Sequence, residues 1–183
     1  DKELLSQFHE GLIVFTGCPS GAVQTRLRLG QWDEAVAEAA ELRDIFGSEN
    51  FYVEVMDHGI DIERRTHQQV LEIAKLMNAP LVATNDAHYV KRDDRKIQDA
   101  LLCINSGSRI NDPDRFKFDG DGYYIRSSDE MRSLWSELPS ACDSTLEIAE
   151  RCDVHFTTTK EGANYMPDFP VPEGEDKTSW FIK

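Results

Sequence analysis

The sequence lacks any apolar run of membrane-spanning length, and it is poor in basic residues for its acidic content. Lysine and arginine number 20 against 34 aspartates and glutamates, so the formal net charge is −14. Proteins that grip duplex DNA need clustered basic side chains, so we expect this segment not to hold duplex DNA by itself. The missing apolar run predicts no membrane span.

Cysteine is scarce, and the four cysteines form no C-x-x-C pair and no spacing typical of secreted disulfide scaffolds. This usage predicts a reducing, cytoplasmic environment. Two motifs of nucleophilic catalysis are also absent. The sixth residue after Cys18 is Gln24, which excludes C-x5-R, and Pro19 occupies the centre of the segment where a G-x-S-x-G elbow needs serine. We therefore expect no nucleophilic cysteine.

Strand-like and helix-like segments alternate along the first half of the chain. With 183 residues and 40% hydrophobic content, the chain has room for one domain and a short extension. The order strand, helix, strand, helix, strand predicts an α/β fold with parallel pairing and right-handed crossovers. After the end of a helix in 1–10, the expected strands are 12–15, 51–56 and 81–84, and the expected helices are 20–29, 32–46 and 62–77.

The second half changes rhythm. A helix is expected over 94–105, followed by a polar loop over 107–122. Ser127 and Glu130 have capping-box spacing before another helix, and Pro139 opens a further one. From Thr157 the sequence becomes linker-like, with three prolines, before the expected first turn of another domain at 178–183.

Candidate metal ligands follow two of the expected strands. Asp86 and His88 come after the 81–84 strand, and residues two apart in an extended segment point the same way. Cys18 lies at the turn after the 12–15 strand. Aspartate, histidine and thiolate are ligands of zinc and similar ions. The alternative is that Asp86 caps the next helix, His88 packs against Tyr89, and Cys18 is a small buried hydrophobe.

Glu54 and His58 lie on and just beyond the 51–56 strand and are expected to approach the same end of the sheet as these candidate ligands. For His58, a phosphate contact or a supporting role beside the ligands is favoured over direct metal ligation. The remaining histidines are interpreted as surface or packing residues.

Four motifs stand in order along the chain: T-G-C-P-S-G (16–21), F-Y-V-E-V-M-D-H-G (51–59), L-V-A-T-N-D-A-H-Y (81–89) and A-L-L-C-I-N-S-G (100–107). They resemble the PHP domain at the N-terminus of bacterial replicative DNA polymerase III alpha subunits. The likeness continues through 123–125 and 130–131 to M-P-D-F-P (166–170).

The resemblance implies a distorted, TIM-like (β/α)7 barrel whose C-terminal mouth holds metal ions. In this family the metal ligands form a ring at the mouth. By position, Cys18, Asp86 and His88 resemble the last three ligands of that ring. The family's H-x-H and other early ligands precede the cysteine turn, but only seventeen residues precede Cys18 here. We therefore expect the C-terminal portion of a PHP domain over 1–156, with 157–183 as linker and start of a polymerase palm domain.

By the same resemblance, the expected activity is metal-dependent phosphodiester hydrolysis, in the form of 3′→5′ proofreading, with Asp86 and His88 acting through bound zinc, manganese or magnesium and His58 contacting substrate. The fragment alone is expected to be inactive. Expected partners are the primer–template 3′ end and replisome subunits such as the sliding clamp. Two alternatives stay open: an inactive PHP scaffold that stabilises the polymerase, and a stand-alone PHP phosphoesterase.

Overall fold

The computed structural model describes residues 2–158, 160, 162, 166–167 and 169–182. The chain divides into two compact units, Asp1–Arg151 and Cys152–Lys183. This division falls slightly before the expected boundary between residues 156 and 157. The predictions for 1–10, for 157–183 and for 166–170 fall in part on residues outside the described ones, namely 1, 159, 161, 163–165, 168 and 183.

The first unit is built around a parallel sheet of three strands in the order β1 (Val14–Phe15), β2 (Phe51–Val55) and β3 (Leu81–Ala83). Val14 pairs with Phe51 and Val55 pairs with Ala83, so all three strands end at the same edge. The expected α/β fold with parallel strands is confirmed. The described residues hold only this small sheet, so the complete (β/α)7 barrel remains an expectation.

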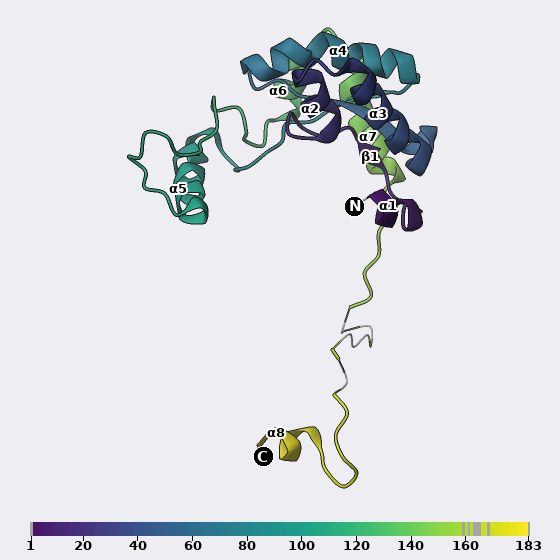
Figure 1. Cartoon of the computed structure of the whole chain (residues 1–183), viewed down its shortest axis with the longest axis vertical. Coiled ribbons are helices and arrows are strands. Elements are labelled where there is room, and N and C mark those ends of the chain that lie inside the picture. Colours follow the sequence, from purple (N-terminus) through teal and green to yellow (C-terminus); the bar gives the residue numbers. More distant parts are fainter. Residues whose placement is uncertain (1, 159, 161, 163–165, 168, 183) are drawn as a thin grey trace. The chain divides into compact units, whose positions relative to one another are not determined.

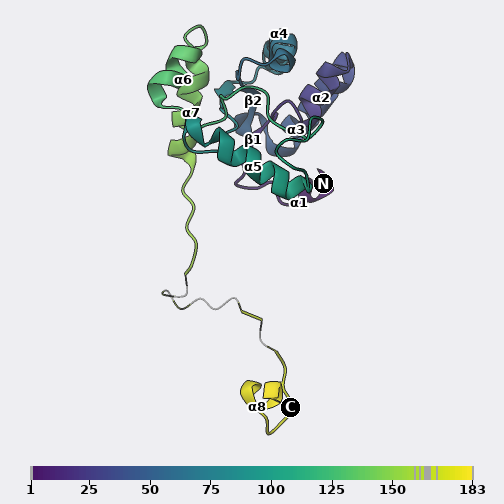
Figure 2. The same ribbon diagram turned by 90° about the vertical axis from the view of Figure 1, so that its left-hand side faces the viewer.

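Helices cover both faces of the sheet, which explains why all five residues of β2 are buried. Figure 2 shows α2, α3 and α4 on one side of the strands and α6 and α7 on the other. The bounds agree with the predicted helices to within one or two residues at most ends; α2, for example, begins two residues later than the predicted 20–29 helix and ends one residue earlier. The helices of this unit are α1 (Lys2–Gln7), α2 (Ala22–Arg28), α3 (Trp32–Phe46), α4 (Asp61–Met77), α5 (Arg95–Ser106), α6 (Ser128–Leu134) and α7 (Pro139–Arg151), with short 3₁₀ turns at Ser48–Asn50 and Arg92–Asp94.

The core lies between these helices and the sheet. The inward face of α4 is the one that its period predicts, with Thr66, Val70 and Ile73 all buried. Ala35 and Ala39 are fully buried on α3, where their small side chains let this helix approach its neighbours closely. Burial of these apolar stripes supplies the main driving force that holds the strand ends in place.

The segment from α5 to residue 124 stands apart from the helices that cover the sheet (Figure 1). It returns to the strand edge through a parallel bridge between Tyr89 and Tyr124. The predicted capping box then starts α6: the Ser127 hydroxyl accepts from the Glu130 N–H, and the Glu130 carboxylate accepts from the Ser127 N–H. The polar loop therefore ends beside the residues that follow β3.

The second unit contains the short helix α8 (Lys177–Ile182), close to the turn expected at 178–183. Its assignment to a palm domain stays a prediction. Among the residues described, the structure contains no helix long and apolar enough to cross a membrane.

Candidate metal centre

Asp86 and His88 lie together just beyond the end of β3. The His88 Nε2 is 3.4 Å from the Asp86 Oδ1, and about a third of each side chain is exposed. The sequence predicted this meeting from strand alternation, but the physical reason is different. β3 ends at Ala83, and Asp86 adopts a left-handed backbone with φ of 38°. A turn therefore brings the two side chains together, and aspartate tolerates that conformation better than most residues.

Cys18 lies in the turn after β1, where its carbonyl accepts a hydrogen bond from the Gly21 N–H at 2.7 Å. The thiol is partly exposed and forms no disulfide. β2 separates β1 from β3 in the sheet, so Cys18 and Asp86 follow strands that are not direct neighbours. Within the described part of the chain, no group of three or more histidine, cysteine, aspartate or glutamate side chains is arranged to hold a metal ion.

Glu54 links the ends of all three strands. Its buried carboxylate accepts a hydrogen bond from the Thr84 hydroxyl at 2.6 Å and another from the Gly17 N–H. Its own N–H donates to the Thr16 hydroxyl at 2.9 Å. Burial raises the pKa of Glu54, the two hydrogen bonds oppose this effect, and the nearby charge of Asp86 adds to it. The turns that carry Cys18 and Asp86 are thus tied to one carboxylate.

His58, for which the sequence favoured a phosphate contact or a supporting role, is buried. Its Nδ1 lies 2.5 Å from the Glu63 carboxylate, and its Nε2 lies 2.9 Å from the Asn85 carbonyl. Only 1% of its side chain is exposed. Burial lowers the pKa of His58, but the hydrogen bond with Glu63 and that with Asn85 outweigh burial and raise it. Because both ring nitrogens are engaged, the geometry gives His58 a supporting role, and direct substrate contact would require one bond to break.

Asn85 connects this support to the polar loop. Its side-chain amide donates to the carbonyls of Gly122 and Tyr124, at 2.8 Å and 2.6 Å. The His88 N–H donates to the Tyr123 carbonyl at 2.8 Å. The turn that carries Asp86 and His88 is therefore fixed from the His58 side and from the loop side together.

Tyr123 is a site residue that sequence reasoning used only as a landmark. Its ring stacks on that of His58, with centroids 4.0 Å apart. Burial, and then the charges of Glu63, Asp86 and Asp119, raise the pKa of Tyr123 to about 12. The phenol therefore stays protonated at neutral pH, and the carboxylates around it add negative charge at this edge of the sheet. The paired tyrosines at 123–124 were the sequence signal for an aromatic residue at the site, but only the fold shows that the Tyr123 ring stacks on His58.

The donor chemistry suits part of a divalent metal site. A carboxylate and an imidazole that face each other and remain accessible are common ligands of zinc and manganese. A structural zinc site has four ligands and a catalytic one usually has three from protein. Asp86 and His88 therefore fit one edge of such a site, and a complete site needs further ligands.

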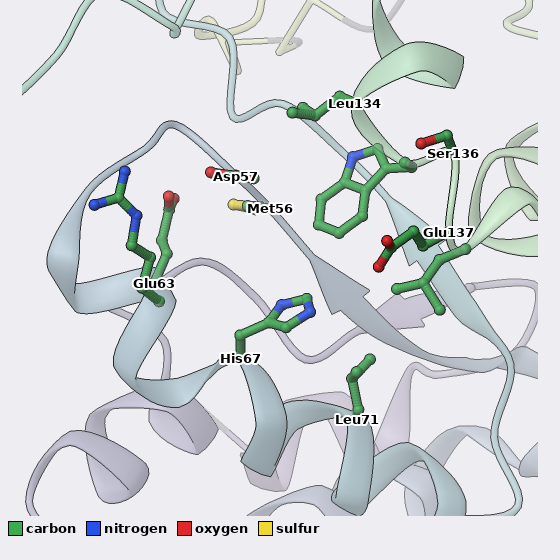
Figure 3. A pocket seen from close by; sticks show the side chains of 11 residues that line it. Met56, Asp57, Glu63, His67, Leu71, Leu134, Ser136 and Glu137 are labelled. Atoms are coloured by element: carbon green, nitrogen blue, oxygen red, sulfur yellow. The ribbon is translucent and has the colours of Figure 1, made fainter.

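A separate cavity of about 570 Å³ lies between the start of α4 and the α6–α7 connection. Figure 3 shows Glu63 and His67 on one side of this space and Leu134 and Glu137 on the other. None of the three predicted metal ligands lines it. Glu63, which binds His58, lines this cavity, but the cavity is not the candidate centre itself.

Comparison with known proteins gives the family context. The model of the PHP domain family matches residues 1–58. The DNA polymerase III subunit alpha of Mycobacterium tuberculosis (strain ATCC 25618 / H37Rv) is 53% identical over 98% of this chain and 15% of its own length. The Saccharopolyspora erythraea protein of the same name is 55% identical over 84% of this chain and 13% of its own length. The Thermus aquaticus protein is 32% identical over 98% of the chain and 15% of its own length.

These matches cover different parts of the candidate centre. The PHP family match includes Cys18, Glu54 and His58 and ends before Asp86 and His88. The alignments with the Mycobacterium alpha subunits span 98% of the chain, and the chain spans 15% of the length of those proteins.

Proposed function

The chain belongs to the DNA polymerase III alpha subunit family through its PHP region, and from this premise we propose that Asp86 and His88 help to hold the metal ions of a phosphodiesterase centre. The parent protein is proposed to be a DNA polymerase, and the centre a 3′→5′ proofreading exonuclease acting on the primer 3′ end. Replisome partners such as the sliding clamp and a cytoplasmic location belong to the same proposal. The observation that carries it is the approach of an accessible imidazole to an accessible carboxylate at the sheet edge.

The chemistry of this proposal divides between the ion and the chain. A bound divalent ion lowers the pKa of coordinated water and stabilises charge on a phosphate. The chain contributes ligand oxygen from Asp86 and ligand nitrogen from His88. Glu54 and His58 hold the turn that carries them, through Thr84 and Asn85. Outer partners of this kind typically change metal affinity about 10- to 100-fold when they are removed.

A PHP scaffold without activity is the second candidate, and one observation favours it. No group of three ligand side chains occurs among the described residues. Under this proposal the region stabilises the parent protein, and Asp86 and His88 are retained without a complete centre. A stand-alone phosphoesterase has less support, because similarity to polymerase subunits extends over 98% of the chain.

The test is Asp86→Asn in the full-length parent protein, with Asp44→Asn as the matched control because the Asp44 side chain is 74% exposed and distant in sequence from the centre. Asparagine preserves shape and removes the charged ligand. We expect Asp86→Asn to lower bound zinc or manganese, to reduce the rise in melting temperature that metal produces, and to abolish removal of a mispaired 3′ end. Primer extension should continue, and the control should match the wild type in all four measurements.

Two outcomes would contradict the proposal in different ways. A wild-type protein that binds metal yet never shortens a mismatched primer, with manganese or zinc present and no dNTPs, would contradict the nuclease and favour the inactive scaffold. An Asp86→Asn protein with unchanged metal content and unchanged metal-dependent melting would show that Asp86 is not a ligand.

A further inference from the structure

A row of aromatic rings borders the Asp86–His88 pair, and metal binding alone does not use it. The Phe118 ring lies 4.5 Å from the His88 ring and 4.8 Å from that of Tyr123, measured between centroids. Phe116 continues the row, edge-on to Phe118 at 5.6 Å. The row therefore runs from the ring of the candidate ligand His88, through Phe118, to the exposed ring of Phe116.

The outer ring is exposed but its backbone is held in place. Phe116 is 63% exposed, so its ring is open to contact from solvent. The preceding residue, Arg115, forms a two-pronged ion pair with Asp99 of α5 at 2.5 and 2.6 Å. Its Nε also donates to the Ile110 carbonyl at 3.0 Å. The aromatic surface is thus anchored to α5, because the partly exposed ion pair between Arg115 and Asp99 holds the segment from which it projects.

The sequence of this segment is unusual for so acidic a chain. Residues 115–118 read R-F-K-F, which alternates a cation with a ring, in a protein of net charge −14. Lys117 is exposed between the two phenylalanines. Exposed aromatics interleaved with basic side chains are the typical surface that binds single-stranded nucleic acid, in which rings stack on bases and cations meet phosphates.

We propose that Phe116 and Phe118 form a stacking platform for the terminal base of a single DNA strand whose phosphodiester reaches Asp86 and His88. The inference rests on the proposed phosphodiesterase centre and names its substrate class as a nucleotide with its base. A flat, unpaired base gains stacking on this surface, whereas a small phosphate ester without a base gains nothing from it. Lys117 contacts a backbone phosphate of the same strand.

The test uses the full-length protein and an oligodeoxythymidylate that ends in 5-iododeoxyuridine at its 3′ terminus. Light crosslinks this base to a ring against which it stacks, and mass spectrometry of the peptides finds the attachment point. A site-specific readout is needed because the parent protein holds DNA elsewhere. We expect the label on the peptide that contains Phe116 and Phe118.

Three variants sharpen the result. Phe116→Leu should weaken labelling of this peptide roughly five-fold to one-hundred-fold, which is the range for loss of one base–aromatic contact. Phe116→Trp keeps an aromatic ring and should retain labelling. Phe8→Leu is the matched control, because Phe8 is 69% exposed and belongs to another part of the chain, and it should behave as the wild type.

A competitor experiment tests the base directly. An unlabelled oligonucleotide with an intact 3′ base should compete for the labelled peptide more strongly than one with an abasic 3′ end. The two should become equal in Phe116→Leu. Equal competition in the wild type, or labelling that never includes residues 115–118, would overturn the platform.

The platform and the nuclease fail separately. Asp86→Asn removes the ligand and leaves the rings, so labelling should persist in that variant even where hydrolysis is absent. Labelling without any hydrolysis in the wild type would remove the nuclease and keep the platform. If the rings instead pack against another region of the parent protein, Phe116→Leu should lower the melting temperature, while the peptide that contains Phe116 and Phe118 stays unlabelled in the wild type, which would refute the platform.

Discussion

The buried pair of His58 and Glu63 should be a measurable source of stability, and Glu63→Gln tests it. The Glu63 carboxylate accepts from the His58 N–H at 2.7 Å and lies 2.5 Å from the His58 Nδ1, and Glu63 is only 6% exposed. Glutamine keeps the shape but offers one acceptor oxygen for two donors. One charge-assisted hydrogen bond is lost and one donor is left buried, which should lower the unfolding free energy by about 2–4 kcal/mol.

The pH dependence identifies the cause. The folded pKa of His58 is raised above the ordinary histidine value of 6.5, since the hydrogen bonds with Glu63 and Asn85 outweigh the opposing effect of burial. A raised histidine pKa contributes stability that is fully present below pH 6.5 and is lost as pH rises through the folded pKa. The difference between wild type and Glu63→Gln should therefore be largest near or below pH 6.5 and should narrow above it.

The measurement is denaturant unfolding of the full-length protein at several pH values, with Glu72→Gln as control. Glu72 lies exposed on the same helix, so its replacement should change the unfolding free energy by less than about 0.5 kcal/mol. Metal affinity gives a second readout, because a loosened Asn85 should weaken binding about 10- to 100-fold. A Glu63→Gln protein as stable as the wild type, or a loss of stability that is the same from about pH 6 to 9, would refute the reasoning.

Two further predictions concern the frame around the centre. Hydrogen bonds from Tyr124 and from Ser127 lower the pKa of Glu130 to about 2, so the contribution of Glu130 to stability is present above pH 4.5 and is lost as pH falls towards 2. Glu130→Gln should therefore make the unfolding free energy less dependent on pH over that range. An unchanged acid profile would argue against these hydrogen bonds. Ile73→Ala removes a fully buried side chain from α4 and should cost about 2–5 kcal/mol in thermal or denaturant unfolding, whereas Leu76→Ala, at 60% exposure, should cost far less; equal losses would show that the face of α4 is assigned wrongly.

Local pattern was enough for most of the architecture. The period of apolar residues in α3 and α4 marks their buried faces, and the run at 51–55 marks a strand buried on both sides. The capping box at Ser127 and Glu130 was also visible, since it depends on residues three apart. Such features follow from short-range sterics and hydrogen bonds, so they are readable without coordinates. The barrel is not one of these features: it is implied by the resemblance alone, and the strands of the described residues form a three-stranded sheet.

The candidate centre was predictable in its residues but less so in its geometry. Asp86 and His88 were named from their position after a strand, and the structure brings them within 3.4 Å. The expected extended geometry was wrong, because a left-handed residue makes the turn. Cys18 stays a predicted ligand. Cys18 is distant in sequence from Asp86 and His88, so only tertiary structure can bring the three together. The described residues contain no group of three ligand side chains that could hold a metal ion.

What the sequence determined by itself was the order of strands and helices and the chemical identity of residues at the strand ends. Tertiary structure alone decided that His58 is buried against Glu63, and that Phe118 lies on the ring of His88. Helix and loop over residues 89–117 separate the rings of His88 and Phe118, and no periodic pattern shows where such a loop returns. Its path is set by side-chain bonds such as those of Asn85 to Gly122 and Tyr124, which exist only when distant segments have already met.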